Sequence, residues 1–330
     1  MKIGTRVRLL IHSLVALICV VLPLSAHAFT VSPALVDVSE DPGSISHGTI
    51  HLLNDTAQDQ TYYVSVQNFV PQGEEGNQTF LPAGDRSGLA GWITPDQSSI
   101  KIGAGSAVDF RWTLNVPADA TPGGHYAAVF FSTQPANSSV GIGAKTGVLM
   151  LVSVTGKVTE AATVESFHVV PMTNVSQTES ATWITSLPAL FELRLANTGN
   201  THIQPEGLIV VRDVFGREVA QVPVNPDKSR VLPQSIRDIR SSWGSTSGVG
   251  EGFLTKLAAE WHGFAIGRYT ATLSADFGRT HTPLAGSVSF WVLPWHILLV
   301  VFGGLLALVV LIKAYNRLVV KSAVRRVSQK

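Results

Sequence analysis

The sequence predicts an all-β protein of two tandem β-sandwiches followed by one C-terminal transmembrane helix. Three observations lead to this fold class. Apolar and polar residues alternate with a period of two along most of the chain, and clusters of turn-forming residues separate the alternating runs. One long apolar run, residues 290–312, stands near the C-terminus.

The clearest strand covers residues 108–116, where five apolar residues alternate with polar ones. Those five are Val108, Phe110, Trp112, Leu114 and Val116. The same alternation predicts strands at residues 62–67, 191–195 and 269–273. Two continuously apolar runs, 127–131 and 148–152, are expected to be central strands buried on both faces.

Turn-forming clusters divide the chain at short intervals, which is typical of β-sandwiches. They lie at residues 41–43, 117–119, 121–124 and 197–200. We place the boundary between the two domains near residue 160, which gives an N-terminal domain at 29–160 and a membrane-proximal domain at 161–289. A two-turn helix is expected at 254–261 within the second domain.

The first 28 residues have the pattern of a secretory signal peptide. Lys2, Arg6 and Arg8 precede an apolar core, and Ala26-His27-Ala28 forms a small-x-small cleavage site. The mature chain is therefore expected to begin at Phe29. The alternative is an uncleaved signal anchor, which the short apolar core and the cleavage site disfavour.

The C-terminal apolar run, residues 290–312, contains His296 as its only ionisable residue and is long enough to cross a bilayer. A basic tail, residues 313–330, follows it and contains no acidic residue. Because Lys and Arg are enriched on the cytoplasmic side, a single-pass type I membrane protein is predicted. Its ectodomain would be extracellular or periplasmic and its C-terminus cytoplasmic.

Composition excludes some function classes. Of the 24 basic residues, three lie in the signal and six in the tail, so residues 29–312 hold 15 basic against 23 acidic residues, a net charge of −8. An acidic ectodomain disfavours nucleic-acid binding. The only cysteine, Cys19, lies in the signal peptide, so the mature protein would have no disulfide. This fits a bacterial surface protein.

A search for catalytic and metal-binding patterns identifies no catalytic residue, metal site or cofactor. The segment 244–248 places Thr246 where a nucleophile elbow needs serine, and the segment 141–147 lacks the helix that a phosphate loop requires. His47 and His51 would lie on one strand face about 13 Å apart, too far to share a metal. The protein is therefore predicted not to be an enzyme.

Acidic and aromatic residues are weighed in the same way. Glu74, Glu75 and Asp85 lie in a polar loop without a calcium-binding pattern and are expected to be solvated. Trp112 shares a face with apolar neighbours and is expected in the core, whereas Trp183 is left open between core and carbohydrate stacking. Three tryptophans near loops remain candidate contact residues: Trp92, Trp243 and Trp261.

Several motifs together resemble the WxL-interacting protein family of bacterial cell-surface proteins. In the first domain they are Trp92-Ile93-Thr94-Pro95, Asn115-Val116-Pro117 and the segment 119–126. In the second domain they are the segments 195–205, 213–216, 224–226, 231–233 and 267–271. The resemblance covers nearly the whole chain and implies two immunoglobulin-like (Ig-like) sandwiches, one membrane helix and a basic tail. It also implies binding to peptidoglycan and to a bacterial surface protein, without naming any binding residue.

The leading functional hypothesis is a non-enzymatic, membrane-anchored surface scaffold or adhesion protein that binds cell-wall glycan or another surface protein. The alternative is a chaperone-like factor that assembles surface fibres by strand donation, because paired Ig-like sandwiches also serve that role. Recovery of peptidoglycan or of an unfolded subunit with the protein would separate the two.

Overall fold

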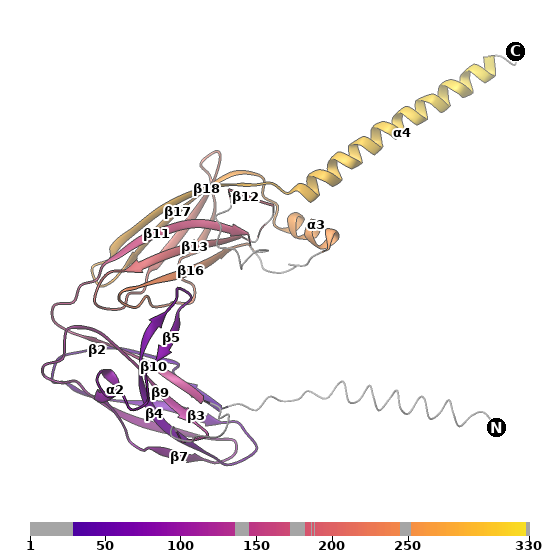
Figure 1. Ribbon diagram of the computed structural model, residues 1–330. Coiled ribbons are helices and arrows are strands. Elements are labelled where there is room, and N and C mark those ends of the chain that lie inside the picture. Colours follow the sequence, from indigo (N-terminus) through magenta and orange to yellow (C-terminus); the bar gives the residue numbers. More distant parts are fainter. Residues whose placement is uncertain are drawn as a thin grey trace, which may run out of the picture.

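The computed structural model describes residues 29–135, 145–171, 182–185, 187, 189–244 and 252–327, and the following description refers to these ranges. The predicted signal peptide lies outside them. The described chain is mostly β-structure with one long C-terminal helix, which confirms the predicted fold class in outline. Figure 1 shows two β-rich halves, with the long helix leaving the C-terminal half on the side away from the N-terminal half.

The N-terminal half contains two sheets. The first has the order β1-β3-β8-β6 and is built from β1 (Phe29–Ser32), β3 (Ile45–Asn54), β8 (Ser106–Asn115) and β6 (Ile93–Pro95). The second has the order β2-β10-β9-β4-β5, with β7 also paired to β4. Its strands are β2 (Leu35–Glu40), β10 (Lys145–Val154), β9 (Gly123–Ser132), β4 (Gln60–Gln72), β5 (Asn77–Phe80) and β7 (Ser99–Ile102). A single helical turn, α2 (Leu89–Trp92), precedes β6.

The C-terminal half also contains two sheets. The order β11-β13-β16 joins β11 (Ala162–Pro171), β13 (Ala189–Asn197) and β16 (Ser235–Trp243). The order β12-β18-β17-β14-β15 joins β12 (Trp183–Ile184), β18 (Thr282–Val292), β17 (Gly267–Phe277), β14 (Glu206–Asp213) and β15 (Glu218–Pro223). The helix α3 (Phe253–His262) lies between β16 and β17 in the chain and confirms the helix predicted at 254–261.

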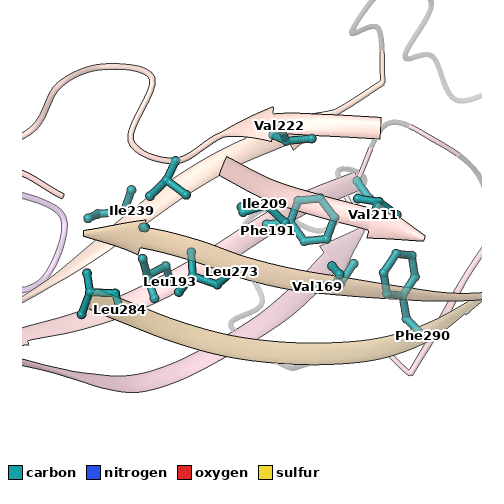
Figure 2. Packing of buried hydrophobic residues seen from close by; sticks show 14 of the residues in the cluster. Val169, Phe191, Leu193, Ile209, Val211, Val222, Ile239, Leu273, Leu284 and Phe290 are labelled. Atoms are coloured by element: carbon teal, nitrogen blue, oxygen red, sulfur yellow. The ribbon is translucent and has the colours of Figure 1, made fainter. Parts of the chain in front are cut away.

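Each half has its own hydrophobic core, to which both of its sheets contribute. In the N-terminal half, Phe110 of β8 packs edge-to-face against Phe131 of β9. In the C-terminal half, Phe191 of β13 meets Phe290 of β18 (Figure 2). The alternation predicted for β8 is confirmed, because Phe110, Trp112 and Leu114 are buried and Val108 is half-buried, while Asp109 and Arg111 are exposed. The division of the chain at residue 160 stays a prediction.

Trp112 lies in the core, as predicted, with 5% of its surface exposed. Its indole lies over Gly48, the residue paired with it on β3. A Cβ added to Gly48 would come within 2.1 Å of Trp112 Cζ2, so the glycine provides the space that the ring occupies. Trp183, by contrast, is 58% exposed and stacks on Trp291, which excludes the core placement left open for it.

The C-terminal helix, α4 (Trp295–Val327), begins later than the apolar run suggested. The predicted membrane segment began at residue 290, but Phe290 and Val292 belong to β18 and are fully buried in the core. Apolar strand residues run directly into apolar helix residues here, so hydropathy alone does not mark the junction. The stretch Trp295–Val319 is long and apolar enough to cross a membrane.

We expect Trp112→Ala to lower the free energy of unfolding by about 3–5 kcal/mol, because it removes a buried indole and leaves a cavity above Gly48. Chemical denaturation of the full-length chain measures the change. Trp183→Ala is the matched control and should change stability little, since this indole is largely exposed. Equal losses in both variants would contradict the core placement of Trp112.

Candidate functional site

One strand edge of the N-terminal half is only partly paired and belongs to β10. This strand pairs with β9 along its full length, but it pairs with β2 only from Leu149 to Val154. Residues 145–148 therefore have one side without a strand partner among the described residues. Leu149 donates its N–H to Ala34 O on the β2 side at 3.0 Å. Because N–H groups alternate along a strand, those of Gly147 and Lys145 face the same open side.

An apolar, aromatic surface adjoins this edge. Phe69, Phe130 and Leu151 form a small buried cluster on the face of the second sheet that points away from the main core. Phe80 of β5 packs edge-to-face on Phe130, with ring centroids 4.8 Å apart. The Lys145 ammonium lies 3.6 Å from the Phe130 centroid, and burial lowers the pKa of this lysine.

A cleft of about 210 Å³ lies between the two halves and continues this surface. Apolar side chains line it from both sides, among them Leu35, Phe69 and Leu149 from the N-terminal half and Leu232 and Ile236 from the C-terminal half. Its basic residues all come from the C-terminal half and are Lys228, Arg230 and Arg237. The cleft therefore combines an apolar floor with positive charge.

Arg237 is the most enclosed of the three basic residues. One of its terminal nitrogens donates to Ser229 Oγ at 3.0 Å, while its Nε is buried without a hydrogen-bond partner. Burial lowers the pKa of Arg237, and the charge of Asp227 partly opposes this effect. A guanidinium lining a cleft can donate hydrogen bonds to a carbonyl or carboxylate oxygen.

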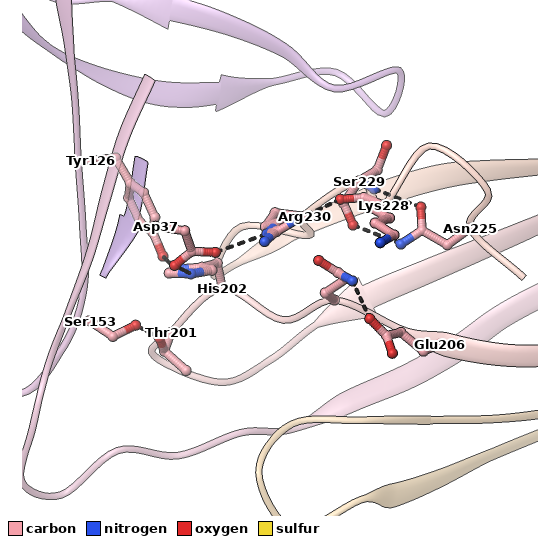
Figure 3. Close-up of polar contacts among 11 residues, drawn as sticks. Asp37, Tyr126, Ser153, Thr201, His202, Glu206, Asn225, Lys228, Ser229 and Arg230 are labelled. Atoms are coloured by element: carbon pink, nitrogen blue, oxygen red, sulfur yellow. Dashed lines mark hydrogen bonds and ion pairs between the residues drawn. The ribbon is translucent and has the colours of Figure 1, made fainter. Parts of the chain in front are cut away.

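Polar contacts around Asp37 join the two halves (Figure 3). Asp37 of β2 accepts hydrogen bonds from His202 Nε2 and Arg230 Nε, each at 2.9 Å. Tyr126 Oη lies 3.3 Å from His202 Nδ1. Burial tends to raise the pKa of Asp37, but the hydrogen bonds and charges of His202 and Arg230 together lower it below its ordinary value. Burial raises the pKa of Tyr126 as well, so its hydroxyl stays protonated.

A second contact comes from the turn between β4 and β5, which reaches the C-terminal half (Figure 1). Glu74 accepts two hydrogen bonds from Arg194, at 2.6 and 2.8 Å, and its carbonyl oxygen accepts the N–H of Asp238 at 2.8 Å. The prediction that Glu74 is merely solvated is therefore wrong. The hydrogen bond from Arg194 lowers the pKa of Glu74. The sequence carries no signal for this pair, because the partners lie 120 residues apart.

A buried charged network continues from this contact into the outer face of β13 and β16. Glu192 is almost completely buried between His168 Nε2, at 3.5 Å, and the guanidinium of Arg240, at 3.4 Å. Burial, together with the neighbouring Glu192 and Glu74 carboxylates, raises the pKa of Asp238 to about 6. Strand alternation alone would have placed Glu192 in water.

The other residues considered from the sequence lie apart from the cleft. His47 and His51 each contact a residue of β8, Thr113 and Asp109, and do not meet. The three candidate contact tryptophans separate: Trp243 packs against the C-terminal core, Trp92 lies against His125, and Trp261 is exposed on α3. Most of the segments 141–147 and 244–248 lies outside the described residues. Among the described residues, no group of three or more His, Cys, Asp or Glu is placed to hold a metal ion.

No protein-family model matches the chain, and no curated protein matches it. Solved structures with a similar fold include fimbrial chaperones. The class 5 fimbriae chaperone CfaA is 10% identical with a TM-score of 0.37, and the match covers 79% of this chain and 98% of that one. The E. coli chaperone DraB is 11% identical with a TM-score of 0.32, and the match covers 80% of this chain and 97% of that one. The Salmonella enterica SafA pilin in complex with the SafB chaperone is 9% identical with a TM-score of 0.31, and the match covers 81% of this chain and 98% of that one.

This comparison corrects the leading functional hypothesis. A surface scaffold or adhesion protein was expected, but the similar structures include several chaperones, among them one of class 5 fimbriae, which corresponds to the alternative. Peptidoglycan as a ligand finds no support in them. The resemblance to WxL-interacting proteins is tested by none of these findings and stays a prediction.

The raised pKa of Asp238 gives a pH-dependent prediction. Its folded-state pKa of about 6 lies above the ordinary value of 3.8, so the stability present below pH 4 is lost as the pH rises through 6. We expect Asp238→Asn to be more stable than the unmodified chain by about 1–2 kcal/mol above pH 6, with the difference vanishing near pH 4. Urea denaturation across this range measures it. The control is Asp119→Asn, on an exposed carboxylate, and a pH-independent Asp238→Asn difference would contradict the assignment.

Proposed function

We propose that this chain is a non-enzymatic, chaperone-like assembly factor that binds a segment of an exported partner protein by adding a strand to the open edge of β10. The single observation that carries the proposal is the unpaired side of residues 145–148. An exposed edge of this kind pairs readily with another chain, and natural proteins usually cover or interrupt it. Its presence beside an apolar cleft supports a binding role.

The surroundings of the edge specify the class of partner. An added strand would continue into the cleft lined by Leu35, Phe69 and Leu149. Alternate side chains of an extended segment would face this apolar surface, while main-chain groups pair with β10. The partner is thus an extended segment with apolar residues at every second position. Arg237 lines the same cleft and adds positive charge to it.

The membrane helix gives the proposed factor a location. We propose that the halves are two tandem Ig-like domains held at the membrane by α4, in the type I orientation. The basic residues Lys313 and Arg317 follow the apolar part of α4, which supports a cytoplasmic C-terminus. The partner would then be bound outside the cytoplasm, before it joins its assembly.

Lys145→Pro tests the strand-addition proposal, with Lys145→Ala as its matched control. Both variants remove the side chain that lies over Phe130, but only proline removes the N–H that faces the open edge. We expect partners that co-purify with the full-length chain from cell envelopes to bind Lys145→Pro at least about fivefold more weakly than Lys145→Ala, because one net hydrogen bond is lost. Circular dichroism and thermal unfolding check that both variants fold alike. Undiminished binding by Lys145→Pro would exclude this edge.

A second experiment tests the membrane anchor. A chain ended after Pro294 should be extracted from membranes by alkaline carbonate, whereas the full chain should resist extraction, because α4 is the one candidate membrane span among the described residues. A chain ended before Phe290 should instead be unstable, since Phe290 and Val292 fill the core. If the chain ended after Pro294 resisted extraction as the full chain does, α4 would not be the anchor.

A further inference from the structure

The helix α3 buries a charged side chain and exposes its apolar side chains, which is the reverse of the usual pattern for a helix on a soluble domain. An amphipathic helix normally buries its apolar stripe and exposes its charges. In α3 the one buried residue is Glu260, at 1% exposure, whereas Leu254 and Trp261 are 75% and 70% exposed. The apolar side chains therefore face away from the domain.

The buried carboxylate fixes α3 to the start of α4. Glu260 Oε1 lies 2.5 Å from His296 Nδ1, and Glu260 Oε2 accepts the N–H of Ile297 at 3.0 Å. The first N–H groups of a helix have no partner within the helix, so Glu260 caps α4 and its negative charge suits the helix N-terminus. The orientation of α3 is consequently coupled to that of the membrane helix.

The exposed apolar side chains of α3 form one continuous surface with α4. Leu254, Leu257, Ala258 and Trp261 follow the spacing i, i+3, i+4 and i+7, which places them on one helix face. Together with Ile297, Val300 and Val301 of α4, they line a groove of about 370 Å³ with few polar atoms. This groove is continuous with the candidate membrane span.

Further exposed aromatic and apolar residues lie at the same end of the C-terminal half as the groove. Trp183 and Trp291 stack with centroids 5.3 Å apart, and Trp295 and Phe264 are also exposed. The β14–β15 turn lies at this end too, because Asp213 pairs with Tyr269 and Tyr269 with Phe290, and this turn exposes Val214 and Phe215. Tryptophan and other aromatic side chains favour the boundary between lipid and water.

We propose that α3 lies within the interfacial layer of the same bilayer that α4 crosses, with its apolar stripe against the acyl chains. The occupant of the groove is thus lipid. The proposal rests on the membrane anchoring proposed above. The apolar stretch of α4 has 25 residues, or about 37 Å of helix, against a hydrocarbon core of about 30 Å. The apolar stretch of α4 is therefore about five residues longer than the hydrocarbon core requires. These extra residues correspond to the first turns of α4, and α3 lines a groove together with residues of those turns.

Site-specific fluorescence in lipid nanodiscs tests the proposal with the full-length chain. Single-cysteine variants are made in a Cys19→Ser background and labelled with a polarity-sensitive dye at three positions. Leu254→Cys reports on α3, Leu305→Cys reports on α4, and Ile45→Cys reports on an exposed apolar position of β3 in the other half. Quenching by spin-labelled lipid is compared with quenching by iodide in the water.

We expect the label at residue 254 to emit at shorter wavelength than the label at residue 45, and to be quenched mainly by lipid spin-labelled near the headgroup. The label at 305 should be quenched by lipid spin-labelled deep in the acyl chain, and the label at 45 mainly by iodide. Iodide quenching at 254 equal to that at 45 would overturn the proposal, as would protection from both quenchers, which indicates a protein cover. If the label at 254 gave either of these contrary results while lipid still quenched the label at 305, the proposed membrane anchor would remain supported. If lipid did not quench the label at 305, both the anchor and the interfacial placement of α3 would be overturned.

Discussion

The pairing of β2 with β10 is the constraint on which the rest of the candidate site depends. By ending at the level of Leu149, this parallel pairing determines how much of the β10 edge stays open. The same strand carries Asp37, whose contacts with His202 and Arg230 join the halves. One short strand thus sets both the open edge and the position of the cleft beside it. A change in β2 would alter the strand pairing and the relative position of the two halves together.

The contacts between the halves are charged and partly buried, and this limits how much they add to the stability of the fold. Removing charges from water costs free energy that ion pairing only partly offsets, so such pairs fix geometry more than they add stability. The Glu74–Arg194 pair and the Asp37 contacts lie on two sides of the cleft, and each holds a different part of it. The charged network around Glu192 and Asp238 connects to the first of these. The relative position of the halves therefore depends on groups that titrate or ionise.

The sequence predicted those features that have a local periodic signal. The alternation in β8 located Trp112 in the core, and the spacing of apolar residues at 254–261 located α3. Features that depend on long-range contacts had no such signal. Glu74 looked solvated because Arg194 lies 120 residues away, and Glu192 looked exposed because alternation does not show what covers the outer face of a sheet. The open edge of β10 follows from strand order, which periodicity does not contain. The start of α4 was missed because Phe290 and Val292 are as apolar as the helix that follows them.

The two ends of the C-terminal half impose different requirements, and the structure satisfies them with different chemistry. The end toward the N-terminal half is held by polar and charged groups, which in the proposed function suit a junction that keeps a cleft accessible to an extended chain. The opposite end exposes tryptophans and an outward-facing apolar helix, which suit contact with lipid. Glu260 lies at the second end, where it connects α3 to the first turn of α4. If both ends are engaged, the cleft and the open edge of β10 are held at a fixed height and direction above the membrane. In the proposed function, a partner segment would then meet the edge in one orientation, and this is the geometric condition that strand addition requires.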